Sequence, residues 1–329
     1  MVSVALCTYN GEKYIEEQLN SIISQTVPVD EIVICDDRSA DDTIKIVKQV
    51  INSAPSSLEI RVYVNESNLG VTKNFEKALS LCNGDIIFLS DQDDVWDSNK
   101  VAKICNVFDE EENCLLTFTD AFLVDAEGNY LDQNLWKLTK PVLKEKYSSL
   151  DFLRSRYVTG ATVAIKKELL AYTIPFPECW IHDAWLAINA SVYGDIIYID
   201  EKLISYRQHH NNVIGAKKRA ILDQIRYTSE HIDRSLAFKP IMKSRFADFL
   251  ERNKDALTND EIRSLKECIQ FWSESEQISN MPPLEGLGSV VSNLLKGRYG
   301  KFNHGLYGAL VDFYIILSRK MQFLSTKKV

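Results

Sequence analysis

The sequence predicts an α/β protein with a mostly parallel sheet and a helical extension toward its C-terminal end. Over the first ninety residues, short apolar runs typical of strands alternate with segments whose apolar residues recur at helical spacing. Beyond about Lys217 the pattern becomes helical. We therefore expect a first domain over residues 1–215 and a helical extension over residues 216–329.

The expected strands of the first ninety residues are 2–6, 31–35, 60–64 and 86–89. The helices between them have apolar faces within residues 14–23, 44–50 and 75–81. We expect Ser39 to be the N-cap of the second helix, with Asp42 three residues on. Gly84 follows the end of the third helix. This strand–helix alternation implies parallel neighbours with helices on both faces of the sheet.

The middle region is richer in strands. Short strands are expected at residues 115–119, 121–124, 158–165, 196–199 and 203–206, with a helix starting near Asp183. A turn is expected at Glu127-Gly128-Asn129. In the extension, Thr258-Asn259-Asp260-Glu261 forms a capping box ahead of an apolar helical face.

Bulk properties are those of a soluble globular protein. Of the 329 residues, 45% are hydrophobic and 26% are charged. The formal net charge of −8 argues against a general nucleic-acid binder, so no nucleic-acid partner is expected. The seven cysteines are scattered without a C-x-x-C pair, and reduced thiols fit a cytoplasmic location. The chain opens on a strand-like segment and not on a leader, and the apolar stretch of residues 306–317 is too short to span a bilayer.

The most informative motif is Asp91-Gln92-Asp93-Asp94, directly after the apolar run of residues 86–89. Three carboxylates at the end of one strand repel each other, so a cation or hydrogen-bond donors are needed to neutralise them. Carboxylate oxygens suit Mg²⁺ or Mn²⁺. The alternative is a solvated acidic turn. Ligands of parallel sheets bind beyond the carboxyl ends of the strands, and the other predicted ends are also polar, which favours a cation site.

Two familiar phosphate-binding devices are missing from the sequence. It contains neither G-x-G-x-x-G after the first strand nor a G-x-x-x-x-G-K-[ST] loop. A bound diphosphate would therefore be neutralised by a metal.

Four segments together resemble the family 2 glycosyltransferases, which have the Rossmann-like GT-A fold. The resemblance covers roughly residues 1–215, and its motifs are Val4-Ala5-Leu6-Cys7-Thr8-Tyr9-Asn10-Gly11, Ile34-Cys35-Asp36-Asp37-Arg38-Ser39, Asn68-Leu69-Gly70 and Leu89-Ser90-Asp91-Gln92-Asp93-Asp94. The segments 91–96 and 206–212 look like those of bacterial rhamnosyltransferases and related capsule or O-antigen glycosyltransferases. Family 2 enzymes invert the anomeric centre.

The resemblance implies a donor site at the strand ends. Asp36 would accept a hydrogen bond from the pyrimidine N3–H, Asp91 would hold the ribose, and Asp93 and His209 would hold the metal. The complete set expected to bind the nucleotide sugar is Thr8, Tyr9, Asn10, Asp36, Asp37, Gly70, Lys73, Asp91, Gln92 and Arg207. Arg207 could pair with phosphate through both of its terminal nitrogens. The alternatives are a capped turn at Asp36 and Asp37, and structural roles for Arg207 and His209.

The acceptor side is expected around His182-Asp183-Ala184-Trp185. Inverting transfer needs a base that takes the proton of the acceptor hydroxyl. The family often has Glu-Asp here, so Asp183 matches as the base and His182 departs from the pattern. The alternative, that Asp183 N-caps its helix, can hold at the same time. The residues expected near the acceptor are Trp96, Gly160, Ala161, His182 and Trp185. For Gly160, a strand bulge is an equal explanation.

The C-terminal tail differs in charge from the remainder of the chain. Residues 296–329 carry seven basic side chains and one acid, Asp312, so the tail is +6 and the remainder −14. An apolar face accompanies this charge, formed by Leu306, Leu310, Phe313, Tyr314 and Leu317. We expect either a helix at an anionic membrane surface, on the inner face of the cell membrane, or one packed on the first domain or in a homodimer.

The expected function is that of an enzyme, a hexosyltransferase or rhamnosyltransferase dependent on Mg²⁺ or Mn²⁺. It would move a sugar from dTDP-rhamnose or a UDP-hexose to a saccharide hydroxyl, on a lipid-linked intermediate of bacterial surface polysaccharide. One alternative is a nucleotidyltransferase, which would need a basic Gly-rich loop that Cys7-Thr8-Tyr9-Asn10-Gly11 lacks. The other is a non-catalytic saccharide-binding protein, against which the intact Asp91, Asp93 and Asp183 argue.

Overall fold

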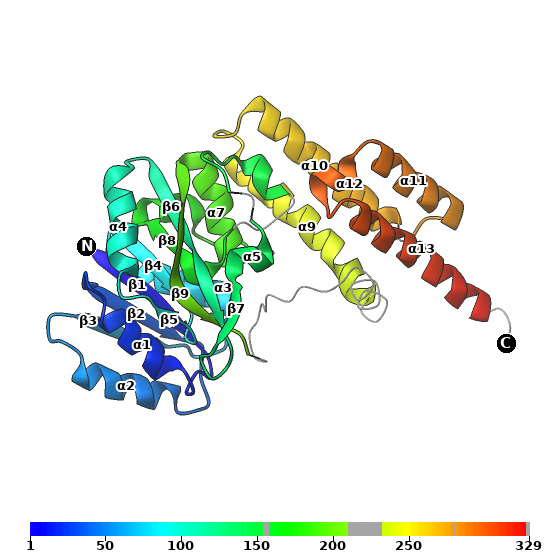
Figure 1. The fold of residues 1–329 in the computed structure, drawn as a ribbon. Helices are drawn as coiled ribbons and strands as arrows, with labels where there is room; N and C mark the ends of the chain where they lie inside the picture. The colour runs from blue at the N-terminus through cyan, green and yellow to red at the C-terminus, as the bar shows by residue number, and fades with distance from the viewer. Residues whose placement is uncertain (142, 154–157, 210–231, 279, 327–329) are drawn as a thin grey trace. The chain divides into compact units, whose positions relative to one another are not determined.

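The computed structural model describes the chain except for residues 142, 154–157, 210–231, 279 and 327–329 (Figure 1). Two compact units are present. One consists of Met1–Ser148 with Arg156–Lys217, and the other of Ser149–Ser155 with Lys218–Val329. The boundary expected between residues 215 and 216 lies outside the described residues.

The first unit is built on one sheet with the strand order β3-β2-β1-β4-β8-β6-β9-β5, with β7 paired to β6. The strands are β1 (Val2–Thr8), β2 (Glu31–Asp36), β3 (Glu59–Val64), β4 (Ile86–Ser90), β5 (Val95–Trp96), β6 (Cys114–Val124), β7 (Tyr130–Asn134), β8 (Val163–Lys166) and β9 (Asp195–Arg207). Strands β3, β2, β1 and β4 are parallel, as are β6 and β9, whereas β8 joins the two groups as an antiparallel strand. The predicted α/β class is confirmed.

Helices cover this sheet because each has one apolar face. The α-helices are α1 (Ile15–Ile23), α2 (Thr43–Ser53), α3 (Val71–Leu81), α4 (Lys100–Glu110), α5 (Leu135–Thr139), α6 (Leu170–Thr173) and α7 (His182–Tyr193), with 3₁₀ turns η2 (Gly160–Thr162) and η3 (Lys167–Leu169). In α1, Leu19 and Ile22 are fully buried against strand residues such as Leu6 and Ile34. Burying such side chains is worth about 1.5–3 kcal/mol each.

Some local predictions were wrong. Helix α2 begins at Thr43, and the Ser39 hydroxyl instead donates to Asp36 Oδ2 at 2.5 Å. The two short strands expected over residues 115–124 form one strand, β6, with a register shift at Asp120. The strand expected over 158–165 is shortened because a 3₁₀ turn occupies Gly160–Thr162 before β8 begins.

The second unit is helical. Its elements are the 3₁₀ turn η1 (Ser149–Leu153) and the helices α9 (Ile232–Asn253), α10 (Asn259–Ile278), α11 (Pro283–Leu295), α12 (Arg298–Phe302) and α13 (Leu306–Thr326). The predicted capping box starts α10, since the Thr258 backbone N–H donates to Glu261 Oε2 at 3.0 Å and the Glu261 N–H donates to Thr258 Oγ1 at 3.3 Å. Among the described helices, none combines the length and apolar character needed to cross a bilayer.

A buried carboxylate interrupts the apolar surface of α13. Asp312 forms an ion pair with Lys239 Nζ at 2.7 Å. It also accepts hydrogen bonds from Ser275 Oγ at 3.0 Å and from Tyr299 Oη at 2.6 Å. Because all these partners belong to the same unit, Asp312 fixes α13 against α9, α10 and α12.

Candidate active site

Carboxylates gather in the acid loop, residues 91–94, between β4 and β5. Burial, reinforced by the charges of Asp93 and Asp183, raises the pKa of Asp91 to about 7. Burial and the neighbouring carboxylates also raise the pKa of Asp94 well above its usual range. The ionised form of both carboxylates is therefore disfavoured by burial and by the neighbouring negative charges, and a divalent cation would stabilise that form.

Two predicted metal ligands meet at this loop although 116 residues separate them in the sequence. His209 Nε2 lies 2.7 Å from Asp93 Oδ2, and the His209 ring stacks on Tyr14. The Asp93 carboxylate supplies the oxygen ligands that Mn²⁺ and Mg²⁺ prefer, and the His209 imidazole would be the weaker ligand of the two. Within the described ranges, no group of three or more His, Cys, Asp or Glu side chains could hold a metal ion by itself. This pair fits an ion whose remaining ligands are substrate oxygens and water.

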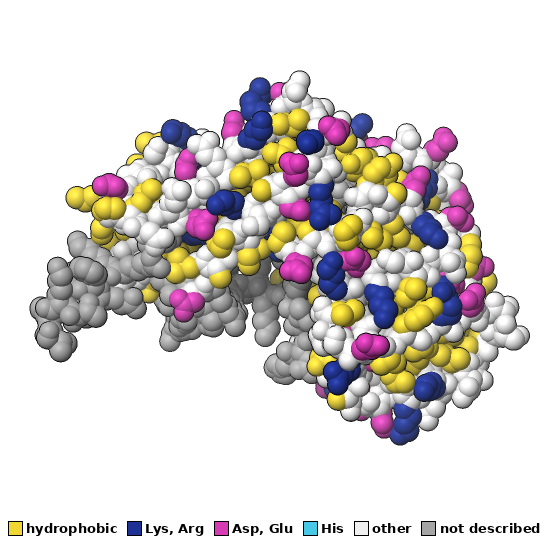
Figure 2. All heavy atoms as spheres, turned by 180° about the vertical axis from the view of Figure 1, so that it is seen from behind, with side chains coloured by type: hydrophobic (Ala, Val, Ile, Leu, Met, Phe, Trp, Pro, Cys, Tyr) yellow, Lys and Arg dark blue, Asp and Glu magenta, His cyan; other side chains and the backbone are white. Residues whose placement is uncertain are grey.

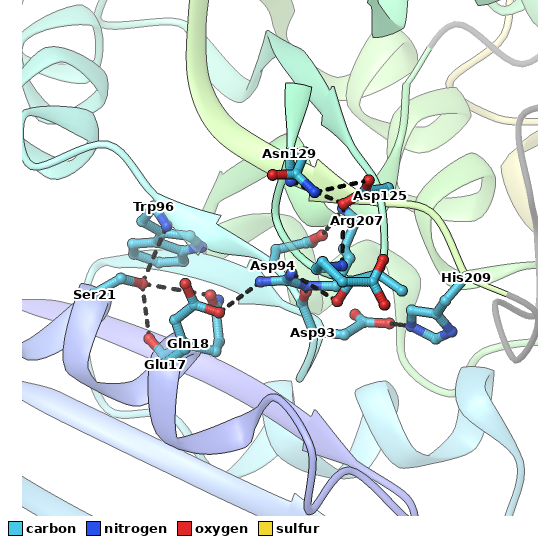
Figure 3. A network of polar contacts seen from close by, with 12 residues as sticks. Glu17, Gln18, Ser21, Asp93, Asp94, Trp96, Asp125, Asn129, Arg207 and His209 are labelled. Carbon is cyan, nitrogen blue, oxygen red and sulfur yellow. Dashed lines mark hydrogen bonds and ion pairs between the residues drawn. The ribbon is translucent and has the colours of Figure 1, made fainter. Parts of the chain in front are cut away.

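Arg207 fastens the acid loop to the sheet (Figure 3). Its Nε donates to the carbonyl of Asp93 at 2.9 Å, and its Nη2 pairs with Glu17 Oε2 at 2.6 Å. The side chain is 3% exposed and stacks over the Tyr14 ring. Arg207 was expected to bind phosphate. These contacts favour a role in holding the backbone of Asp93.

Helix α1 also supports the loop, through residues that the sequence analysis missed. The Ser21 hydroxyl accepts a hydrogen bond from the backbone N–H of Trp96 at 3.1 Å (Figure 3). The Gln18 amide lies 2.7 Å from Ser90 Oγ. Glu17 pairs with Arg207. The only sequence signal was a polar Gln18 next to the apolar positions of the helix.

The ends of β1, β2 and β4 are joined by what we call the strand-end network. Thr8 Oγ1 donates to the buried Asp36 carboxylate at 2.8 Å. Asn10 Oδ1 accepts from the Ala40 N–H at 2.8 Å. Gln92 holds the backbone of Tyr9, accepting from its N–H at 2.7 Å and donating to its carbonyl at 3.0 Å. The predicted residues are thus brought together, and their polar groups bind one another.

Within this network, Tyr9 differs from its neighbours because its side chain is exposed to solvent. Tyr9 is 50% exposed. Its ring is available as a stacking surface for a planar ligand such as a nucleotide base.

The loop after β3 is organised by Asp37. This carboxylate accepts from the backbone N–H of Leu69 at 2.7 Å and from that of Gly70 at 2.9 Å. Gly70 has a φ of 78°, which favours glycine. Lys73 Nζ donates to the carbonyl of Phe176 at 2.6 Å and pairs with Glu76. Asp37, Gly70 and Lys73 therefore organise the segments after β2 and β3 through contacts within the protein.

The predicted base, Asp183, lies in the first turn of α7 and is 7% exposed. Its Oδ1 accepts from the Ala184 N–H at 2.6 Å, and its Oδ2 accepts from the Gly160 N–H at 3.2 Å. The N-cap position itself is held by Ile181. The effect of Asp183 on the pKa of Asp91 places its charge near the acid loop.

Gly160 is explained by a close approach to a neighbouring ring. A Cβ atom at this position would lie 2.6 Å from His182 Nε2, a distance that real contacts do not reach. His182 is buried and stacks on Phe75 with ring centroids 4.1 Å apart. The glycine therefore allows the η2 turn to pack on α7 beside Asp183.

Three residues expected at the acceptor lie in the core. Trp185 is 0% exposed and its indole N–H donates to the carbonyl of Thr173 at 2.8 Å, so its ring cannot stack on a sugar. Trp96 is buried against Phe88. The side chain of Ala161 is buried as well. Packing within the unit leaves the Trp185 ring no exposed surface for the acceptor, whereas an approach of the acceptor to Trp96 or to the backbone at Ala161 stays a prediction.

Fold and site together define a glycosyltransferase with the GT-A fold. The family model described as "Glycosyl transferase family 2" matches residues 3–172, and the chain belongs to this family. A dTDP-rhamnosyl transferase, RfbG of Shigella flexneri, is 34% identical over 225 residues, which span 64% of this chain and 74% of RfbG. A putative teichuronic acid biosynthesis glycosyltransferase, TuaG of Bacillus subtilis, is 28% identical over 67% of this chain and 84% of its own length.

Solved structures support the same fold at lower identity. Crystals of S. aureus TarS 1-349 in complex with UDP-GlcNAc give a TM-score of 0.58 at 20% identity, over 98% of this chain and 92% of that one. A mannosyltransferase from Pyrobaculum calidifontis, PcManGT in complex with GDP-Man and Mn²⁺, gives a TM-score of 0.54 at 17% identity. That match covers 97% of this chain and 86% of the mannosyltransferase. The likeness spans the helical extension as well as the sheet-bearing unit.

Proposed function

We propose that this glycosyltransferase is metal-dependent and inverting, and moves rhamnose or a hexose from a nucleotide diphosphate sugar to a saccharide hydroxyl. The observation that carries this proposal is the contact between His209 Nε2 and Asp93 Oδ2, which lie 2.7 Å apart. Asp91 of the same acid loop also interacts electrostatically with Asp183. Within the donor class we favour dTDP-rhamnose and then a UDP-hexose, because RfbG is named a dTDP-rhamnosyl transferase. The names of RfbG and TuaG also support an acceptor in bacterial surface polysaccharide synthesis, on a lipid-linked intermediate.

The residues divide the chemistry between two sides of the site. Asp93 and His209 would hold the metal, which when bound supplies the positive charge that stabilises a leaving diphosphate. Arg207 and Glu17 keep the Asp93 backbone in place. Asp183 takes the proton of the acceptor hydroxyl as that oxygen attacks the anomeric carbon. Its bond to the Gly160 N–H directs one carboxylate oxygen, so the geometry of η2 sets the orientation of the base.

Thermal unfolding with a panel of nucleotide sugars tests the donor class. We expect dTDP-rhamnose to raise the Tm in the presence of Mn²⁺ and to raise it little in excess EDTA, because the diphosphate needs the ion. Ligand at 100 times its Kd stabilises the folded state by about 2.7 kcal/mol. The same panel with free dTDP, UDP and GDP separates base recognition from sugar recognition. The metal-dependent donor site is refuted if neither the nucleotide sugars nor the free nucleotides shift the Tm with Mn²⁺.

The C-terminal helices carry a second proposal, on the location of the enzyme. In the described parts of α11 and α13, six large apolar side chains are exposed, and they are Leu284, Val291 and Leu295 on α11 and Leu306, Leu310 and Leu317 on α13. Their exposure supports peripheral contact of a cytoplasmic enzyme with the inner face of the cell membrane, or a homodimer, as the role of this unit.

Charge contributes less to that contact than the tail composition indicated. Arg298 pairs with Glu274 at 2.6 Å and Lys301 pairs with Glu267 at 2.8 Å, so α10 neutralises two of the seven basic residues. Lys327 and Lys328 lie outside the described residues. On the face that Figure 2 presents, basic and acidic side chains are interspersed among hydrophobic ones, and neither sign forms a continuous patch.

Point substitutions test this location better than a truncation. Deleting α13 removes Asp312 and leaves Lys239 buried without its ion-pair partner, which typically costs about 3–5 kcal/mol. We expect Leu284→Gln with Leu295→Gln to weaken sedimentation with phosphatidylglycerol vesicles while activity on a soluble acceptor persists. These leucines are 86% and 83% exposed, so folding should be preserved. If the intact protein does not bind vesicles and is a dimer, and the double variant is a monomer, the exposed face is a subunit interface.

A further inference from the structure

Lys100 is a fully buried lysine at the start of α4, with 0% of its surface exposed. Its Nζ donates to the carbonyl of Ala161 at 2.9 Å and lies 4.0 Å from the centroid of the Trp96 ring. Lysines are almost never fully buried unless paired, because desolvating an ammonium group is costly. A buried amine at this place therefore needs a reason in the surrounding structure.

Both groups that the amine touches belong to segments of the candidate site. Trp96 lies two residues beyond the acid loop, and its backbone N–H donates to Ser21 Oγ. Ala161 lies in the η2 turn. Gly160, which is the first residue of the same turn, donates its N–H to Asp183 Oδ2. The turn is closed by the Thr162 N–H, which donates to the Thr159 carbonyl at 2.8 Å. Lys100 thus spans the gap between the donor side and the acceptor side of the site.

The local electrostatics agree with this placement. Burial lowers the pKa of Lys100 to about 7, whereas the charges of Asp94 and Asp91 oppose that change. The indole face of Trp96 and the Ala161 carbonyl both present negative potential to the amine. Lys103, one turn further along the same helix, is only partly buried and pairs with Glu201, so it provides a natural comparison.

We propose that Lys100 is a positioning residue for sugar transfer, which fixes the η2 turn relative to the acid loop and thereby orients Asp183. The amine does not touch the reacting atoms. It holds the Ala161 carbonyl, the adjacent Gly160 N–H then points at Asp183, and the carboxylate keeps one oxygen directed toward the acceptor hydroxyl. This inference rests on the proposed role of Asp183 as the base. A purely structural lysine would stabilise the fold without affecting the orientation of Asp183.

Kinetics of Lys100→Met test the positioning role. The methionine side chain is similar in length and cannot donate to Ala161. We expect kcat to fall about tenfold to a hundredfold, as for a misplacement of about 1 Å, with the donor KM within about twofold of wild type. Lys103→Met should leave both constants unchanged. Lys100→Gln, which keeps a donor in a smaller side chain, should lose less activity and serves if the methionine variant does not fold.

A double-mutant cycle with Asp183→Asn identifies the route of the effect. If Lys100 acts through Asp183, the double variant is no slower than Asp183→Asn alone. Independent, multiplicative losses would overturn the proposal, as would a fall in donor affinity equal to the fall in kcat. These kinetic measurements use the donor sugar that stabilises the wild-type enzyme.

Hydrogen exchange gives a readout that needs no substrate. The Gly160 amide should exchange faster in Lys100→Met than in wild type or in Lys103→Met, because the η2 turn is no longer held. Unchanged exchange at Gly160 would show that Lys100 does not control this turn. If exchange accelerates while Asp183→Asn remains active, the link between Lys100 and the turn holds and the assignment of Asp183 as the base fails.

Discussion

Replacing Asp93 by alanine is expected to abolish sugar transfer together with metal-dependent donor binding, while the fold is retained. The variant leaves His209 as the remaining member of the pair that the structure places at 2.7 Å. One imidazole is a poor site for Mg²⁺ or Mn²⁺, which prefer oxygen ligands. The loss should exceed the roughly 10–100-fold that follows removal of an outer-shell partner of a metal ligand. Initial rates and calorimetric titration with UDP or dTDP and Mn²⁺ measure the two effects.

Asp97 provides the matched control for this experiment. It lies three residues beyond the acid loop, is exposed, and binds the backbone N–H of Asn99. Asp97→Ala removes the same chemical group from the same segment and should retain metal-dependent donor binding. The metal hypothesis fails if wild type keeps full activity in excess chelator and Asp93→Ala binds the donor normally.

For Asp183→Asn we expect kcat to fall by about 10²–10⁴-fold, with donor affinity nearly unchanged. The amide has the shape of the carboxylate, and its oxygen can still accept one of the two backbone hydrogen bonds, from Ala184 or from Gly160. It cannot accept the proton of the acceptor hydroxyl. Steady-state rates at saturating donor, combined with the Tm of the variant, separate loss of the base from loss of the fold.

The opposite outcome also has a clear meaning. A variant that turns over within a few-fold of wild type but unfolds at a lower temperature would make Asp183 a residue that stabilises the first turn of α7. Glu178→Gln is a suitable control. Glu178 is an exposed carboxylate in the segment that precedes α7, and the substitution leaves the contact between Asp183 and Gly160 in place.

The sequence predicted the sheet because buried strands are apolar runs, and because residues that follow parallel strands must gather at one edge. Thr8, Asp36 and Gln92 meet there for that reason. The pairing of Asp93 with His209 could be inferred only from family resemblance, since it depends on the long-range pairing of β9 with β5, the strand that follows the acid loop. Helical spacing marked Glu17 and Gln18 merely as polar positions on α1, and only the packed structure shows that Gln18 is buried and that Glu17 pairs with Arg207.

Errors arose where burial decides a role that residue type leaves open. An aromatic residue near a polar motif is typical of a sugar site, yet Trp185 packs in the core and donates to a backbone carbonyl. Serine is a common N-cap residue, but the hydroxyl of Ser39 donates its hydrogen bond to the nearby Asp36 carboxylate. Lys100 shows the same effect of packing, since the structure encloses this lysine completely.

The strand-end network has a consequence for how such an enzyme could acquire a new donor. Asp36, Asn10 and Gln92 each join two strand ends, so a substitution there disturbs the contacts between the strand ends before it changes any preference among nucleotides. The Tyr9 side chain does not join strand ends, because Gln92 binds the Tyr9 backbone and the ring is half exposed. Libraries for altered nucleotide preference should therefore begin at Tyr9, and variants at the joining residues should be judged first by their stability.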